Sequence, residues 1–248
     1  MEGLDQVVEL LVRSTRVIAL TGAGISVESG IPAFRGSQGL WNRYDPIEYA
    51  HIDSFRTNPG RVWEMLKEMR AIVDKAQPNA AHQALVQLKR LGRLDSIITQ
   101  NVDSLHQAAG STDVIEFHGN GATLVCLDCG RRIPRHEVSL ENLPPLCSCG
   151  GVLKPGVVFF GEPIPPKALA RAYQAASTCE LMLVIGTSAA VTPASLMPEM
   201  AVQSGAKVIE VNIEPTDLTG RLANHTLLGS AGQIMPLVAA QVQAALAG

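Results

Sequence analysis

The hydrophobic positions of the chain gather in short, β-branched runs, separated by longer segments with one apolar face. The runs cover residues 17–20, 96–99, 114–117, 181–185 and 207–211, with a weaker sixth run at 226–228. Their length and composition are typical of parallel strands buried on both faces. The segments between them predict helices over residues 3–14, 61–75, 79–91, 102–109, 166–177, 193–203 and 231–246. Strands that alternate with helices in this way predict an α/β fold with a doubly wound, Rossmann-like parallel sheet.

Two segments interrupt the alternation. Residues 34–76 are rich in Trp, Tyr and Arg, and residues 121–154 contain paired cysteines and a Pro-Pro break. Neither segment is long enough to bury a core of its own, so we expect the two to form one small, partly helical lobe beside the sheet. The predicted division is a discontinuous nucleotide-binding domain, residues 1–33, 77–120 and 155–248, and a small domain, residues 34–76 and 121–154.

The overall composition excludes some classes of protein. A net charge of −3 disfavours a protein that holds nucleic acid through its phosphates. No apolar run approaches the ~18 residues that a membrane span requires, and the acidic N-terminus lacks an apolar signal segment. We therefore expect a cytoplasmic protein with neither a nucleic-acid nor a membrane partner.

Four of the five cysteines form two close pairs, Cys126 with Cys129 and Cys147 with Cys149, separated by 17 residues. Two such pairs suit tetrahedral Zn²⁺, and the spacing matches a zinc ribbon, although the second pair has one spacer residue instead of two. A site closed by four sulfurs has no open coordination position, so the predicted role of the metal is structural. The fifth cysteine, Cys179, is remote from the pairs in sequence and is expected to be a packed thiol.

A glycine-spaced turn, Gly22-Ala23-Gly24-Ile25-Ser26, follows the first apolar run. Such a turn, opening into a helix, presents backbone N–H groups on which a nucleotide's phosphates can sit. The usual dinucleotide fingerprint would place a third glycine at position 27, where this chain has Val27. The missing glycine and the cysteine pairs together disfavour an ordinary hydride-transferring dehydrogenase.

Polar residues follow four of the predicted strands, at the edge where open parallel sheets bind their ligands. They are Gln100 to Asp103, His118, Gly186 to Ser188, and Asn212 to Glu214. Amides and hydroxyls with few formal charges suit a ribose, and a histidine among them can accept the proton of a ribose hydroxyl at neutral pH. At the start of the first insertion, Phe34 and Arg35 are candidates for a flap over a bound cofactor.

Together, eight motifs resemble, in family order, the sirtuin family of NAD-dependent protein deacylases in its bacterial and archaeal form. The motifs cover about residues 15–235 and are Gly22-Ala23-Gly24-Ile25-Ser26, Gly30-Ile31-Pro32-x-Phe34-Arg35, Gln100-Asn101-x-Asp103, His118-Gly119, the cysteine pairs, Val157-Val158-x-Phe160-Gly161-Glu162, Gly186-Thr187-Ser188 and Asn212-x-Glu214. The short second cysteine pair departs from the pattern of the family.

The resemblance implies NAD as co-substrate and one structural Zn²⁺ on the four cysteines. It implies that NAD contacts Gly22, Ala23, Gly24, Ile25, Ser26, Pro32, Phe34, Arg35, Trp41, Gln100, Asn101, Val102, Asp103, Gly186, Thr187, Ser188, Asn212, Ile213, Glu214 and Ala231. It further implies that His118 is the general base, with Asn101 and Asp103 beside it in the catalytic pocket. The implied reaction converts NAD and an acyl-lysine into nicotinamide, O-acyl-ADP-ribose and free lysine.

The resemblance also indicates where the acylated protein or peptide binds. Val158, Phe159, Phe160, Gly161 and Glu162 are expected to pair with an extended peptide as an added strand. Relatives that prefer acidic acyl groups carry a Tyr and, three residues later, an Arg, at positions that align with Leu66 and Met69 here. Because both residues are apolar in this chain, we expect neutral acyl groups to be favoured over succinyl.

Two other functions use the same motifs. Transfer of ADP-ribose to protein requires the same cleavage of NAD, and the sequence does not separate it from deacylation. A non-catalytic module that binds NAD or ADP-ribose is the second alternative, and His118 argues against it because such a module needs no general base.

Overall fold

A parallel sheet forms the centre of the larger lobe. The computed structural model describes residues 3–34 and 39–248. The strands of this sheet are β1 (Val17–Thr21), β2 (Ser96–Thr99), β3 (Val114–Glu116), β7 (Leu181–Ile185), β8 (Lys207–Asn212) and β9 (His225–Leu228). They lie in the order β3-β2-β1-β7-β8-β9 and are all parallel, so the strand order reverses where β1 meets β7. The predicted doubly wound sheet is confirmed, and ligands of such sheets bind at this point of reversal.

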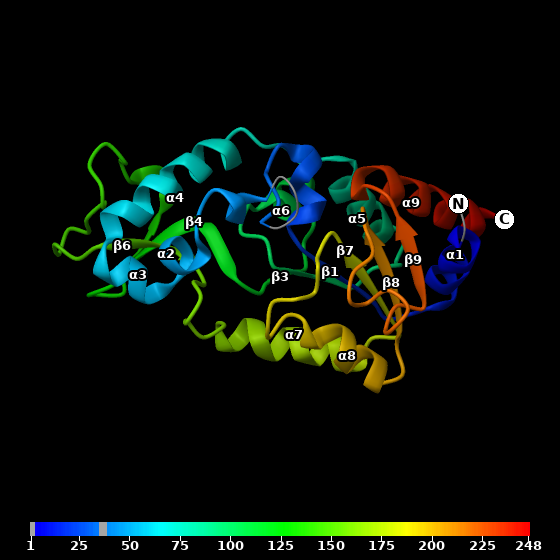
Figure 1. Cartoon of the computed structure of the whole chain (residues 1–248). Helices are drawn as coiled ribbons and strands as arrows, with labels where there is room; N and C mark the ends of the chain where they lie inside the picture. The colour runs from blue at the N-terminus through cyan, green and yellow to red at the C-terminus, as the bar shows by residue number, and fades with distance from the viewer. Residues whose placement is uncertain (1–2, 35–38) are drawn as a thin grey trace.

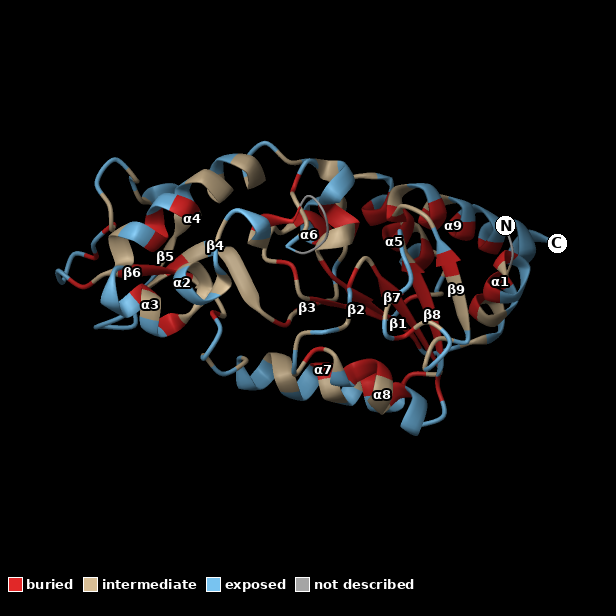
Figure 2. Ribbon diagram, viewed as in Figure 1, coloured by how far each residue is buried: buried red, intermediate tan, exposed pale blue. Residues whose placement is uncertain are grey.

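Helices cover both faces of the sheet (Figure 1). On one face lie α1 (Leu4–Arg13), α5 (Ala80–Arg90) and α9 (Ala231–Ala247), and on the other lie α7 (Pro166–Thr178) and α8 (Leu196–Gln203). Each face has its own apolar core, centred on residues such as Leu11, Leu85 and Met235 on the first and Phe117 and Met182 on the second. The central strands β1, β2 and β7 are buried along their whole length, as Figure 2 shows, which explains why their sequences are mostly apolar.

The two interrupting segments fold together into the small lobe. Its helices are α2 (Pro46–Ala50), α3 (Ile52–Thr57) and α4 (Pro59–Val73), and its antiparallel sheet, in the order β5-β4-β6, consists of β4 (Gly119–Cys126), β5 (Arg132–Pro134) and β6 (Leu153–Val157). Phe55, Trp63, Leu124 and Leu153 are almost fully buried where the helices meet this sheet. The indole N–H of Trp63 donates to the Leu153 carbonyl at 2.9 Å, which joins α4 to β6.

The structure differs from the sequence-based prediction at several element ends. The turn after β1 opens into a 3₁₀ helix, η1 (Ala23–Ser29), instead of an α-helix. The helix predicted from residue 102 begins later, as α6 (Leu105–Ala109), because Ser104 adopts a positive φ of 65°. Short elements of the small lobe were not predicted: α2, α3, η2 (Leu40–Asn42), η3 (Arg135–Glu137) and the strands β4, β5 and β6. Within the described ranges, no helix is long and apolar enough to cross a membrane.

Candidate active site

The turn after β1 and the turn after β7 interlock at the point where the strand order reverses. The N–H of Gly22 donates to the Ile185 carbonyl at 3.1 Å, and that of Gly24 donates to the Gly186 carbonyl at 2.8 Å. A Cβ on Gly22 would lie 2.6 Å from the Cβ of Thr187, and a Cβ on Gly24 would lie 2.7 Å from the Cα of Gly186. Both glycines are therefore required by the contact between the two turns, whether or not a phosphate also approaches them.

Side chains that follow β2 connect the turns after β1 and β7. Asn101, 8% exposed, donates from Nδ2 to the Gly22 carbonyl and to the Ser26 hydroxyl, both at 3.1 Å. The hydroxyl of Ser26 donates in turn to Asp103 Oδ2 at 2.8 Å. Gln100 donates from Nε2 to the Thr187 hydroxyl at 2.9 Å. The structure thus brings together predicted site residues from three different strand ends in one hydrogen-bond network.

His118 lies in the connection between the two lobes, after the end of β3 at Glu116 and directly before β4 begins at Gly119. Its Nδ1 is 3.1 Å from the Gln100 carbonyl, and because a carbonyl can only accept, Nδ1 carries the proton and Nε2 is left as the basic nitrogen. Burial lowers the pKa of His118, and the hydrogen bond to Gln100 opposes this shift. The imidazole is therefore neutral at pH 7 and able to accept a proton through Nε2.

Residues after β8 and at the start of α9 form the other end of the predicted ligand-binding edge of the sheet. Asn212 Nδ2 donates to the Thr187 carbonyl at 3.2 Å, while Ile213 is 72% exposed. The predicted residue Glu214 is also exposed, and Ala231 is the first residue of α9. Exposed apolar and polar groups beside a half-buried amide are the mixture that nucleoside recognition requires.

The stretch predicted as a flap is only partly described. The rings of Phe34 and Trp41 stack with their centroids 5.2 Å apart. The backbone N–H of Trp41 donates to the Phe34 carbonyl at 3.0 Å. Arg35 lies outside the described residues. Pro32 lies in the extended stretch that leads from η1 to this ring pair.

Three charged or titratable residues that support the site were not found from the sequence. Glu210 on β8 is fully buried and accepts hydrogen bonds from the hydroxyls of Thr216, Thr219 and Thr226 in the segment beyond Asn212. Glu28 accepts from the Gly232 N–H at 2.6 Å, at the start of α9. His106 is buried against Thr21, and burial lowers its pKa to about 3. No motif marks such residues, because their burial depends on partners distant in sequence.

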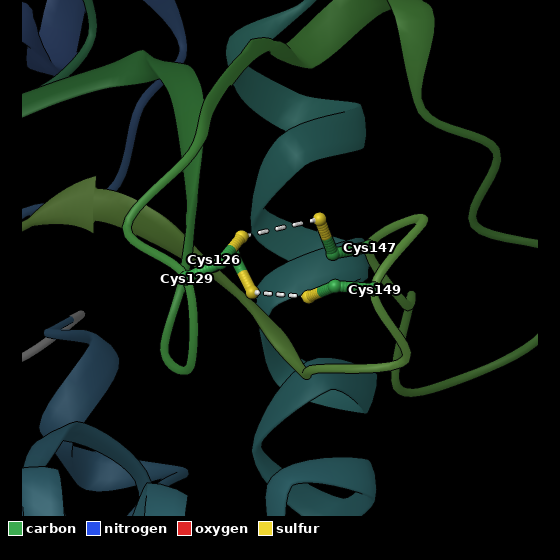
Figure 3. Close-up of side chains that lie close together, drawn as sticks. All are labelled: Cys126, Cys129, Cys147 and Cys149. Carbon is green, nitrogen blue, oxygen red and sulfur yellow. Dashed lines mark hydrogen bonds between the residues drawn. The ribbon is translucent and has the colours of Figure 1, made fainter.

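The four paired cysteines converge, as Figure 3 shows. All four sulfurs lie within 4.8 Å of one another, with Cys126 and Cys149 3.5 Å apart and Cys129 and Cys147 3.8 Å apart. A tetrahedral Zn²⁺ with Zn–S bonds of about 2.3 Å requires sulfurs about 3.8 Å apart, so the set fits this ion despite its short second pair.

The protonation of the cysteines also fits a metal. The backbone N–H of Cys149 lowers the pKa of Cys147, to about 6. The Gly151 N–H lowers the pKa of Cys149. The sulfurs of Cys129 and Cys126 together raise it by more, so that the pKa of Cys149 is about 12. Four thiolates therefore require a cation between them, and a structural Zn²⁺ supplies it.

The predicted peptide segment connects directly to His118. The N–H of Val158 donates to the His118 carbonyl at 2.8 Å. Phe160 forms a bridge with His51, since its N–H donates to the Ala50 carbonyl at 2.8 Å and its carbonyl accepts from Ile52 at 2.9 Å. The segment is thus held between His118 and the helices of the small lobe.

The predicted acyl-pocket residues lie on α4. Leu66 is partly buried against the core of the small lobe, and Met69 is half-buried. The next residue, Arg70, directs its guanidinium along the helix, where Nε lies 3.3 Å from Asp74 Oδ2. Arg70, which follows Met69, is therefore paired with an acid, and Lys67, which follows Leu66, donates to the Leu140 carbonyl at 2.9 Å.

Comparison with known proteins gives a consistent result. Residues 22–193 match the model of a family described as the Sir2 family. The chain is 44% identical to the NAD-dependent protein deacylase 1 of Archaeoglobus fulgidus, over 98% of this chain and 99% of that protein. It is similar to a crystal structure of a Sir2 homologue with NAD, at a TM-score of 0.90 and 43% identity over 98% of this chain and 94% of the other. A Sir2 structure with p53 peptide and NAD⁺ gives a TM-score of 0.89 at 35% identity, over 98% of this chain and 100% of the other.

Proposed function

Since this chain belongs to the Sir2 family and is an NAD-dependent protein deacylase, we propose that it removes neutral acyl groups from lysine in preference to acyl groups that carry a carboxylate. NAD is its co-substrate, and an acylated protein or peptide is its second substrate. The observation that carries the preference is the chemistry of α4, where Leu66 and Met69 offer no cation and Arg70 is paired with Asp74. Burial of a carboxylate there without a partner costs several kcal/mol. Such a cost favours neutral acyl groups over acyl groups that carry a carboxylate.

We assign His118 as the general base that removes a proton from a ribose hydroxyl. The assignment rests on the hydrogen bond between Nδ1 and the Gln100 carbonyl, which leaves Nε2 as the acceptor. The glycine turn, Gln100, Asn101 and Asp103 would hold the NAD phosphates and ribose, because their network lies where the strand order reverses. Asn212, Ile213 and Glu214 would hold the adenosine half.

The test is a panel of one peptide carrying acetyl-, butyryl- or succinyl-lysine, assayed with and without NAD. We expect NAD-dependent loss of the acyl group, with kcat/KM for acetyl and butyryl above that for succinyl. Succinyl turnover equal to acetyl turnover would contradict the proposed preference but not the deacylase activity. Mass spectrometry of the same samples would reveal a gain of ADP-ribose, which distinguishes the alternative transferase reaction.

A double variant tests the pocket directly. Leu66→Tyr with Met69→Arg introduces a hydroxyl and a guanidinium at i and i+3, on one face of α4. We expect kcat/KM for succinyl-lysine to rise relative to acetyl-lysine, while the KM for NAD stays unchanged. The cytoplasmic location and the lack of nucleic-acid or membrane partners remain predictions from the sequence.

A further inference from the structure

Lys154, on β6, is a buried cation in the small lobe. The residue is only 6% exposed, a degree of burial that lysines rarely reach without a partner. Its ammonium donates to the carbonyls of Pro155 and Val157 at 3.1 and 2.7 Å, and to Glu162 Oε2 at 2.9 Å. It also lies 4.6 Å from the ring centroid of Phe159. All of these partners belong to residues 155–162, so one side chain contacts both ends of that segment.

Glu162 completes the arrangement. The oxygen that accepts from Lys154, Oε2, also accepts from the Phe159 N–H at 2.9 Å. The segment 157–162 is thus folded around a single ion pair, with Lys154 at the centre. Burial lowers the pKa of Lys154, the hydrogen bond and charge of Glu162 raise it, and the charges of Arg132 and Arg56 lower it. The ammonium therefore depends on Glu162 and on the two backbone carbonyls for its stability.

The same segment is attached to the catalytic histidine. Val158, one residue beyond the carbonyl bound by Lys154, donates its N–H to the His118 carbonyl at 2.8 Å. Phe160 is held on its other side by the backbone of Ala50 and Ile52. The ion pair thus fixes a stretch of chain that contacts both His118 and the small lobe at the predicted peptide site.

We propose that Lys154 is a positioning residue for the acyl-peptide, which acts through Glu162 by holding residues 157–160 in place between His118 and the small lobe, where an added peptide strand would pair. This inference rests on the proposed peptide site at residues 158–162. Lys154 itself touches neither co-substrate. Its effect belongs to peptide binding and not to NAD binding, because its hydrogen-bond partners are Pro155, Val157 and Glu162 and none of them belongs to the glycine turns.

The test is Lys154→Met, which keeps the stem of the side chain and removes the charge. We expect the KM for the acyl-peptide to rise about tenfold or more while the KM for NAD changes by less than about twofold. Lys154→Arg should restore most of the peptide affinity, since a guanidinium can donate to the same carboxylate and carbonyls. An unchanged peptide KM, or an equal change in both KM values, would overturn the proposal.

Two further measurements keep the result interpretable. If Lys154→Met fails to fold, the double variant Lys154→Met/Glu162→Gln removes the partly buried carboxylate that has lost its partner, and the same split in KM is expected of it. Lys67→Met is the matched control, because Lys67 lies in the same lobe and donates to the Leu140 carbonyl at 2.9 Å but is exposed. This variant should leave both KM values unchanged.

Hydrogen exchange on the wild-type protein separates failure of this proposal from failure of the peptide site. Acyl-peptide should protect amides between residues 157 and 162. If it does not, the peptide site is wrong, and the proposal for Lys154 falls with it. If it does, and Lys154→Met shows the same protection and the same peptide KM, only the role of Lys154 is wrong.

Discussion

The state of His118 is set by a backbone carbonyl and by burial. The Gln100 carbonyl fixes the proton on Nδ1, and burial keeps the ring neutral. Its place at the ligand-binding edge could be predicted, because residues after parallel strands collect there. Its tautomer could not, since the carbonyl that determines it belongs to another strand. Glu210 and Lys154 were missed for a similar reason, because a charged residue in a sequence carries no sign that it will be buried.

The pH dependence of the reaction follows from the lowered pKa of His118. The base works only when neutral, so activity is lost as pH falls through its pKa. Because burial moves that pKa below the usual 6.5, we expect the acidic limb of kcat/KM to lie below pH 6.5. A pH–rate profile from pH 5 to 8 checks this, and a limb centred above 6.5 would contradict it. His118→Ala should abolish deacylation and leave NAD binding measurable by calorimetry.

Replacement of Gly24 tests the interlocked turns. An added methyl would meet the Gly186 backbone at 2.7 Å, so Gly24→Ala should lower the free energy of unfolding by about 1–3 kcal/mol and weaken NAD binding. Gly60→Ala is the control, because Gly60 lies in the first turn of α4 and its nearest neighbours would be 3.9 Å from the new methyl. Thermal unfolding of both variants, with and without NAD, provides the comparison.

At the scale of elements, the sequence predicts the position of a strand where every residue of the strand is buried. It does not predict the strands whose pairing depends on contacts between distant parts of the chain. The buried strands β1, β2, β7 and β8 coincide with the short apolar runs of the sequence, and their positions were predicted within a residue or two. The strands β4, β5 and β6 alternate less regularly. Their pairing depends on the cysteine cluster and on Trp63, which are brought together only by the fold.

Metal removal should affect the small lobe first. We expect about one zinc per chain, and Cys147→Ser should abolish zinc binding, because the site would lose one of its four sulfur ligands. Metal analysis and far-UV circular dichroism with and without a chelator measure both effects. The control is Cys179→Ala, a buried thiol whose N–H and sulfur bond to its own helix, and it should retain zinc. Folded, fully active protein without zinc would contradict the prediction.

At the scale of the whole molecule, the chain passes between the two lobes in a few connecting segments. Asn79 stabilises the segment that leads from α4 in the small lobe to α5 in the larger lobe. Its side chain caps α5 by accepting from the Ala81 N–H, and its Nδ2 donates to the Ile25 carbonyl and the Ser29 hydroxyl of η1. The return of the chain from the small lobe is therefore tied to the turn after β1. The sequence predicts a helix that starts at residue 79, whereas the contact of Asn79 with η1 depends on the fold.

Asn79→Ala should lower the free energy of unfolding by about 1–2 kcal/mol through the lost cap, and should also weaken NAD binding through η1. Asn58→Ala is the matched control, since Asn58 caps α4 in the small lobe by accepting from the Arg61 N–H. It should cost similar stability and leave NAD affinity unchanged. Denaturant unfolding and NAD titration of the two variants separate the effects, and equal NAD affinity in both would contradict the role of Asn79 at η1.

The position of His118 between β3 and β4 has a consequence for inhibition. Strand β3 of the large sheet ends at Glu116, and strand β4 of the small sheet begins at Gly119. A Cβ on Gly119 would lie 2.2 Å from the Gly156 carbonyl oxygen. The connection that carries His118 is therefore short and tightly packed. A small molecule that separates the lobes would displace the His118 imidazole while the hydrogen bonds between the turns after β1 and β7 stayed intact. Such a compound would lower the maximal rate without competing with NAD.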